Sequence, residues 1–141
     1  MTVKNNINNE TVLQEEDFDH IGIIKLTFGR QEKGKKEISE LDFESSHYLL
    51  DKAKDVVRRG YSKVILDLQN VTYIDSEGIW TLYEMHDNLK KLSCGFVLLK
   101  PKGDVRRMLD AIKVSMKIKV FDDVINDSIN YQATTVRITG F

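Results

Sequence analysis

Short apolar runs alternate along this chain with segments in which apolar residues recur at helical spacing, and this alternation constrains the fold more than any other feature. The runs at 64–68 and 96–99 are almost wholly apolar, which is typical of strands covered on both faces of a sheet. Residues 118–121 form a further β-prone run, and residues 11–14 and 21–28 predict a hairpin. The sequence therefore predicts an α/β fold, in which a mixed sheet of about four to five strands carries about four α-helices.

The helices are expected between and after these strands. The first begins near Asp42 and spans about 16 residues, and the second runs from Asp75 to about Leu92. The third occupies residues 105–112, and Asp122 is the expected N-cap of the fourth. The residues expected on their buried stripes are Phe43, Leu50, Ala53 and Val57 in the first helix, Ile79, Leu82, Tyr83, His86 and Leu89 in the second, and Val105, Met108, Leu109 and Ile112 in the third.

Length, charge and hydropathy define the broad class of the protein. With 141 residues, of which 41% are hydrophobic, the chain is long enough for one domain with its own core. A net charge of −1 lacks the basic excess that binding to a phosphate backbone requires, so nucleic acid is not expected as a main partner. The apolar runs fall well short of the roughly 20 residues of a membrane helix, so membrane insertion is not expected. The absence of a signal-peptide pattern and the lone Cys94 indicate a cytoplasmic protein.

The chain is expected to divide into three parts. Residues 1–10 are rich in asparagine with almost no apolar side chain, which predicts a flexible arm. Residues 11–131 hold the predicted strands and helices and form the domain. Residues 132–141 form a β-prone tail for which the sequence predicts no position.

The segment from Val64 to Ile79 carries the most specific signal in the chain. It combines a buried strand, a short connection and the sequence Asp75-Ser76-Glu77-Gly78 at a helix start. Glu40-Leu41-Asp42 precedes the first expected helix, and Val105-Arg106-Arg107-Met108-Leu109 is followed by Val120-Phe121-Asp122. In this order, the pieces resemble the STAS domain of bacterial anti-sigma factor antagonists over most of residues 11–131.

This resemblance implies a switch based on protein binding. Ser76 would be phosphorylated by an anti-sigma factor that is also a serine kinase, and Asp42, Asp75, Glu77 and Gly78 would form the phosphorylation pocket. The unphosphorylated domain would bind that kinase and release a sigma factor, and a separate serine phosphatase would remove the phosphate. The resemblance implies a regulatory protein that is not itself an enzyme.

Physical arguments support a switch at this position. A serine in the first helical turn lies near free backbone N–H groups and the positive end of the helix dipole, which tolerate a phosphate. A phosphate also adds about −1.5 to −2 charges, which would repel or desolvate a docked partner. Helical spacing places Trp80, Glu84 and Asp87 on the same flank as Ser76, so these three residues are the expected docking residues.

Simpler interpretations exist for the same residues. Asp75 or Ser76 can serve only as a helix N-cap, which contributes about 1 kcal/mol, and Trp80 can simply cover a neighbouring element. The domain can also be a constitutive scaffold, or a subunit of a signalling or transport assembly in which Ser76 is never modified. In that case the fold would be the same and phosphate would be absent.

Catalytic and nucleotide-binding alternatives have weaker motifs. Ser76, Asp75 and His86 could suggest a hydrolase, but Ile74 stands where a nucleophile elbow requires glycine. The loop 29–36 matches the start of a phosphate-binding loop, but it lacks the serine or threonine that holds magnesium. Weak nucleotide binding by this loop stays open, and no cofactor is otherwise expected. The dispersed histidines and the single cysteine predict no metal site.

Overall fold

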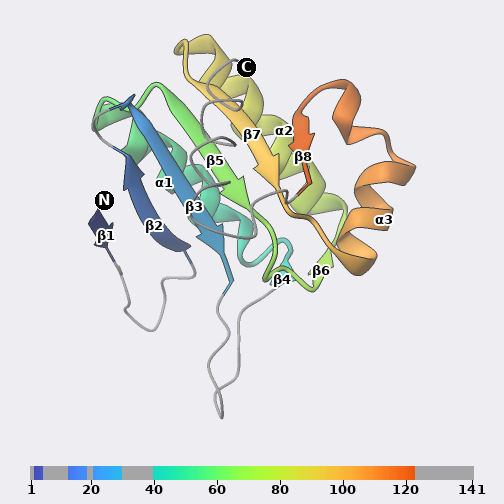
Figure 1. Cartoon of the computed structure of the whole chain (residues 1–141). Coiled ribbons are helices and arrows are strands. Elements are labelled where there is room, and N and C mark those ends of the chain that lie inside the picture. The colour runs from blue at the N-terminus through green and yellow to red at the C-terminus, as the bar shows by residue number, and fades with distance from the viewer. Residues whose placement is uncertain (1, 5–12, 19–20, 30–39, 123–141) are drawn as a thin grey trace.

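The computed structural model of the chain describes residues 2–4, 13–18, 21–29 and 40–122 (Figure 1). A six-stranded sheet has the strand order β1-β2-β3-β5-β7-β8, and β4 and β6 form a separate pair. The strands are β1 (Thr2–Lys4), β2 (Leu13–Phe18), β3 (Ile23–Phe28), β4 (Glu40–Leu41), β5 (Lys63–Asp67), β6 (Tyr73–Ile74), β7 (Gly95–Leu99) and β8 (Lys119–Phe121). The helices are α1 (Ser46–Arg58), α2 (Ser76–Lys91), α3 (Gly103–Ala111) and the short 3-10 turn η2 (Val114–Met116).

The main sheet is mixed, as the sequence predicts. Strands β1, β2 and β3 pair antiparallel, whereas β3, β5, β7 and β8 pair parallel. Strands β2 and β3 form the expected hairpin, with Leu13 opposite Phe28. The α/β fold class is confirmed, and the described residues contain three α-helices. The fourth helix expected after Asp122 and the tail at 132–141 lie outside the described residues.

The main core lies between the sheet and helices α1 and α2, which cover one face (Figure 1). Leu26, Leu66 and Leu98 are fully buried in the three central strands and belong to the same cluster as Leu49 of α1 and Leu82 of α2. Strands β5 and β7 lie on the almost wholly apolar runs of the sequence, so the feature that predicts the fold also supplies much of its core. This core fixes α2 against the sheet and thereby fixes the position of its first turn.

Helix α1 differs from the prediction at its beginning. It starts at Ser46 rather than near Asp42, because residues 42–45 form a turn held by the Asp42 carboxylate. Phe43, expected on the buried stripe, therefore precedes the helix and is 75% exposed. Ala53 is buried as predicted, and the predicted Leu50 and Val57 pack partly buried against the core. Leu49 and Val56, one position earlier, are fully buried.

The other helices match their predicted positions but bury narrower faces. In α2 the completely buried Met85 takes the central place for which His86 was expected, and Tyr83 and His86 are only partly buried. In α3 Val105 and Leu109 are buried, whereas Met108 of the predicted stripe is exposed. Ile112, which also belongs to that stripe, is exposed as the C-cap residue after α3. A helix as short as α3 packs along a single line of residues, so the outer members of its stripe stay in water.

Strand β1 lies within the segment for which the sequence predicts a flexible arm. Residues Thr2–Lys4 pair with β2 at the edge of the sheet, with Val3 opposite Glu16. Backbone hydrogen bonds at a sheet edge do not require apolar side chains, so composition alone did not indicate this strand. The remaining residues of the predicted arm lie outside the described part of the chain.

Candidate functional site

The strand pair β4–β6 brings the start of α2 next to the turn before α1. The two strands are parallel, with Leu41 opposite Ile74. The Asp75 N–H donates to the Leu41 carbonyl oxygen at 3.3 Å. Because parallel strands end at the same edge, the residues that follow them, Asp42 and Asp75, lie at one end of this pair together with Ser76.

Two aspartates fix the local backbone at this end. The Asp42 carboxylate accepts the N–H and the hydroxyl of Ser45, at 3.1 and 3.0 Å. Asp75 is the N-cap of α2, and its carboxylate accepts the Gly78 N–H at 2.8 Å. The interpretation of Asp75 as a helix cap is therefore confirmed. The Asp75 carboxylate thus fixes the first turn of α2, which contains Ser76, and the Asp42 carboxylate fixes the turn before α1.

Gly78 permits the close approach of α2 to β4. A Cβ atom at this position would lie 2.1 Å from the Leu41 carbonyl oxygen and 2.8 Å from Cγ1 of Ile74. Real Cβ atoms do not approach other atoms this closely, so any other residue would displace the helix start. Glycine at this position thus sets the distance between the first turn of α2 and the turn that contains Asp42.

Ser76 is the first residue of α2, and its side chain is exposed, as is that of Glu77. The backbone N–H groups of this turn and the helix dipole form a favourable environment for a negative charge. Three exposed aromatic residues come from the elements that meet at this end, namely Phe43 after β4, the half-exposed Tyr73 of β6, and Trp80 of α2. Exposed aromatic side chains that gather where several strands and helices meet are typical of a surface that binds another protein.

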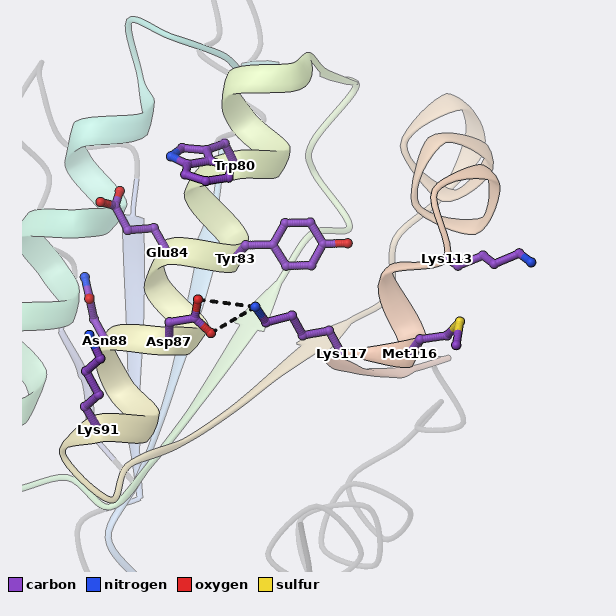
Figure 2. Close-up of a pocket in the computed structure, with 9 residues that line it drawn as sticks. All are labelled: Trp80, Tyr83, Glu84, Asp87, Asn88, Lys91, Lys113, Met116 and Lys117. Carbon is purple, nitrogen blue, oxygen red and sulfur yellow. Dashed lines mark hydrogen bonds and ion pairs between the residues drawn. The ribbon is translucent and has the colours of Figure 1, made fainter.

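A surface groove continues from this end along α2 (Figure 2). It has a volume of about 480 Å³ and is lined by Trp80, Tyr83, Glu84, Asp87, Asn88, Lys91, Lys113, Met116 and Lys117. Figure 2 shows Lys117 reaching across to Asp87, with nitrogen–oxygen distances of 3.2 and 3.3 Å. The Lys117 ammonium also lies 5.3 Å from the centroid of the Tyr83 ring. Hydrogen bonds from Lys117 and His86 hold the pKa of Asp87 below its usual value.

The three predicted docking residues lie along this groove. Trp80 is 65% exposed and Glu84 is exposed, whereas Asp87 is engaged with Lys117. Sequence reasoning did not identify the opposite wall, which contains Met116 and Lys117. An isolated methionine within the lysine-rich run 113–117 was the available signal, but no local pattern could show that this run lies across from α2.

The geometry also excludes a catalytic serine–histidine pair on α2. Ser76 and His86 are ten positions apart on one helix, which separates them by about 15 Å along its axis. The Nδ1 atom of His86 instead lies 3.3 Å from the Asp87 carboxylate. In the described part of the chain, no group of three or more His, Cys, Asp and Glu side chains could hold a metal ion. The phosphate-loop alternative concerns residues 30–36 of the glycine-containing loop, which lie outside that part.

A model of the STAS domain family matches residues 38–126. The chain belongs to the STAS domain family. This match confirms the family resemblance and covers both strands of the β4–β6 pair and all of α2. No helix within the described ranges of this STAS domain is long and apolar enough to cross a membrane.

Individual proteins that are similar to this STAS domain include some named as anti-sigma factor antagonists. The "Putative anti-sigma factor antagonist TM1081 homolog" of Thermotoga neapolitana is 26% identical over 86 residues, which are 60% of this chain and 76% of the relative. The crystal structure of TM1081 from Thermotoga maritima has a TM-score of 0.64 at 19% identity, covering 86% of this chain and 95% of that chain.

The STAS domain also has the same fold as SpoIIAA, an anti-sigma factor antagonist and Bacillus cell fate determinant. The unphosphorylated form of SpoIIAA gives a TM-score of 0.60 at 15% identity and covers 92% of this chain and 99% of that chain. The phosphorylated form gives 0.58 at 15% identity and covers 84% and 97%.

Proposed function

We propose that this STAS domain is an anti-sigma factor antagonist controlled by phosphorylation of Ser76. In its unphosphorylated form it binds an anti-sigma factor serine kinase, and the bound kinase releases a sigma factor. Phosphorylation of Ser76 by that kinase ends the binding, and a serine phosphatase restores it. The names of the relatives support the general class, and SpoIIAA provides a precedent for a phosphorylated form of the same fold.

The position of Ser76 is the observation that carries this proposal. Its exposed side chain can enter a kinase active site without unfolding the domain. Asp75 and Gly78 hold the first turn of α2, and Asp42 holds the turn before α1, so the backbone that carries Ser76 has a fixed position. A phosphate on Ser76 would be accepted locally by the start of the helix, and the fold would survive the modification.

The same phosphate would be strongly unfavourable for a docked partner. It adds about −1.5 to −2 charges next to Asp75 and Glu77, and so concentrates negative charge on one turn. A partner surface that covers Ser76 would have to remove water from this charge, or would bring its own negative groups close to it. Like charges brought together at an interface cost several kcal/mol, which is enough to reverse binding.

The test compares four baits in affinity capture from a lysate of the source organism, with mass spectrometry of bait and captured proteins. The wild type and Ser76→Ala should retain a kinase of the anti-sigma factor class, whereas Ser76→Asp should lose it. Ser76→Asn is the matched control for Ser76→Asp, because it has nearly the same shape without the charge, and it should still capture the kinase. The wild type recovered from cells should carry phosphate on Ser76.

Two other results would support a different function. Capture of the same non-kinase proteins by all four baits, with no phosphate on Ser76, would indicate a constitutive scaffold or assembly subunit. Heat of binding on titration with ATP or GTP in the absence of any partner would indicate a nucleotide-binding protein. A folded Ser76→Ala variant that fails to capture the kinase would contradict the switch directly.

A further inference from the structure

Lysines gather around the second half of α2 and the elements opposite it. The groove of Figure 2 shares Lys117 with a second hollow of about 360 Å³, which is also lined by His86, Lys90 and Lys119. We call this surface the lysine face, and define it by Lys90, Lys91, Lys113, Lys117 and Lys119.

The lysine face has a local charge that the composition of the chain does not explain. Among the described lining residues, its five lysines face only two carboxylates, Glu84 and Asp87, although the whole chain has a net charge of −1. Asp87 is already paired with Lys117. The dipole of α2 favours Lys90 and Lys91 in its last turn, but the other three lysines come from the segment 113–119.

Two exposed apolar side chains accompany this charge. Trp80 is 65% exposed at one wall of the groove, and Met116 is 82% exposed at the opposite wall. Tryptophan is enriched at the centres of protein interfaces, and the flexible methionine side chain adapts to varied apolar partners. Figure 2 shows Tyr83 and Lys117 between the two walls, with Met116 pointing away from α2. The surface therefore offers one exposed apolar contact on each wall, with lysines near both.

We propose that the lysine face docks an acidic segment of the partner protein, in which apolar side chains that contact Trp80 and Met116 are accompanied by carboxylates. This inference rests on the proposed docking of a partner along α2 and specifies the chemistry of that partner. The central Glu84 and Asp87 would repel the continuous negative charge of a nucleic acid or of an anionic membrane. A protein segment can instead place its carboxylates beside the lysines and away from these two residues.

The test begins with a random-peptide phage library selected on the immobilised wild-type protein. The expected result is enrichment of peptides in which an apolar residue is flanked by Asp or Glu. A synthetic peptide of the most enriched sequence is then titrated while tryptophan fluorescence is recorded. Trp80 is the only tryptophan in the chain, so a change in its emission reports directly on the groove.

Charge variants decide whether the lysines are responsible. The double variant Lys91→Glu/Lys113→Glu should bind the peptide at least about tenfold more weakly, and the wild-type affinity should fall as salt is raised. Lys54→Glu changes an exposed lysine of α1 outside the lysine face, so this variant should bind the peptide with the affinity of the wild type. Circular dichroism verifies that all variants are folded.

Three results would overturn the inference. The first is selection of basic or purely apolar peptides, and the second is a double variant that binds the peptide as tightly as the wild type does. The third is a wild-type protein that binds an oligonucleotide or phosphatidylserine vesicles but no acidic peptide. The peptide assay involves neither a kinase nor phosphate, so it fails independently of the switch. A kinase captured in a manner sensitive to Ser76 but unaffected by Lys91→Glu/Lys113→Glu would contradict this inference and leave the proposed function intact.

Discussion

Gly78 shows at the scale of one residue how the site depends on close packing. Gly→Ala in a helix ordinarily stabilises a protein by about 0.5–1 kcal/mol. Here the added Cβ would lie 2.1 Å from the Leu41 carbonyl oxygen, so the helix start must move. We expect Gly78→Ala to lower the free energy of unfolding by about 1–3 kcal/mol in urea denaturation. Unchanged or increased stability would show that the contact between α2 and β4 is looser than described.

Cys94 provides a second prediction at this scale. The side chain is buried, and burial raises the pKa of its thiol to about 11. Since only the thiolate reacts with disulfide reagents, the native protein should react very slowly with Ellman's reagent near neutral pH. The same protein in concentrated urea should react rapidly and serves as the control. Equal rates in both conditions would contradict the buried position.

At the scale of elements, the start of α2 depends on its cap. Removal of the Asp75 carboxylate leaves the Gly78 N–H without its acceptor, and loss of such a cap costs about 1 kcal/mol. Asp75→Ala should therefore lower the free energy of unfolding by this amount, measured in urea. Asp75→Asn keeps a capping oxygen and should lose much less. Equal losses in both variants would mean that the charge of Asp75, rather than its hydrogen bond, supports the helix.

At the scale of the whole molecule, ion pairs join β2 to α1 and to the C-cap residue of α1, Arg59. Glu15 is buried, and its carboxylate lies 2.7 Å from Lys52 and 2.8 Å from Arg59. Burial alone would raise the pKa of Glu15, but the hydrogen bonds and charges of Lys52 and Arg59 outweigh burial and lower it. The folded state thus favours the ionised carboxylate, and this stabilisation is lost as pH falls below the ordinary value of 4.5 through the lowered pKa.

Measurement of unfolding across the acidic range tests this relation. Glu15→Gln should lower stability near neutral pH by about 1.5–3 kcal/mol, and it should flatten the decline of stability in acid. Glu44→Gln changes an exposed carboxylate and should leave the curve close to that of the wild type. Parallel curves for the wild type and Glu15→Gln would exclude Glu15 as a source of the acid sensitivity.

The sequence predicts the sheet and α2 well because their signals are local. Apolar runs identify β5 and β7, and Asp75 before an amphipathic segment identifies the start of α2. The beginning of α1 was predicted wrongly because Phe43 is apolar and in helical register, whereas hydrogen bonds between Asp42 and Ser45 keep its segment in a turn. Two-residue strands such as β4 and β6 have no periodic signal at all and exist only as a pair.

Within the candidate site, residues signalled by one segment of sequence can be predicted, whereas residues brought together by the tertiary fold cannot. Ser76 and Trp80 were identified from a motif and from helical spacing, which are properties of one segment. Tyr83 shares a stripe with buried residues and packs partly buried against the core, as this stripe predicts. Its ring also lies beside Lys117 in the groove, which the stripe does not predict. The opposite wall of the groove, with Met116, depends on how the chain returns after α3, and no single segment of sequence contains that information.

The pairing of β4 with β6 has a consequence for the time at which the protein becomes functional. These strands are separated in the chain by α1 and β5, so their contact closes a long loop and is expected late in folding. Pulsed hydrogen exchange should show the Asp75 N–H gaining protection after the amides of β3 and β5. Until then the start of α2, which carries Ser76, is not held against β4. A kinase that recognises the assembled surface would therefore modify only chains that have finished folding.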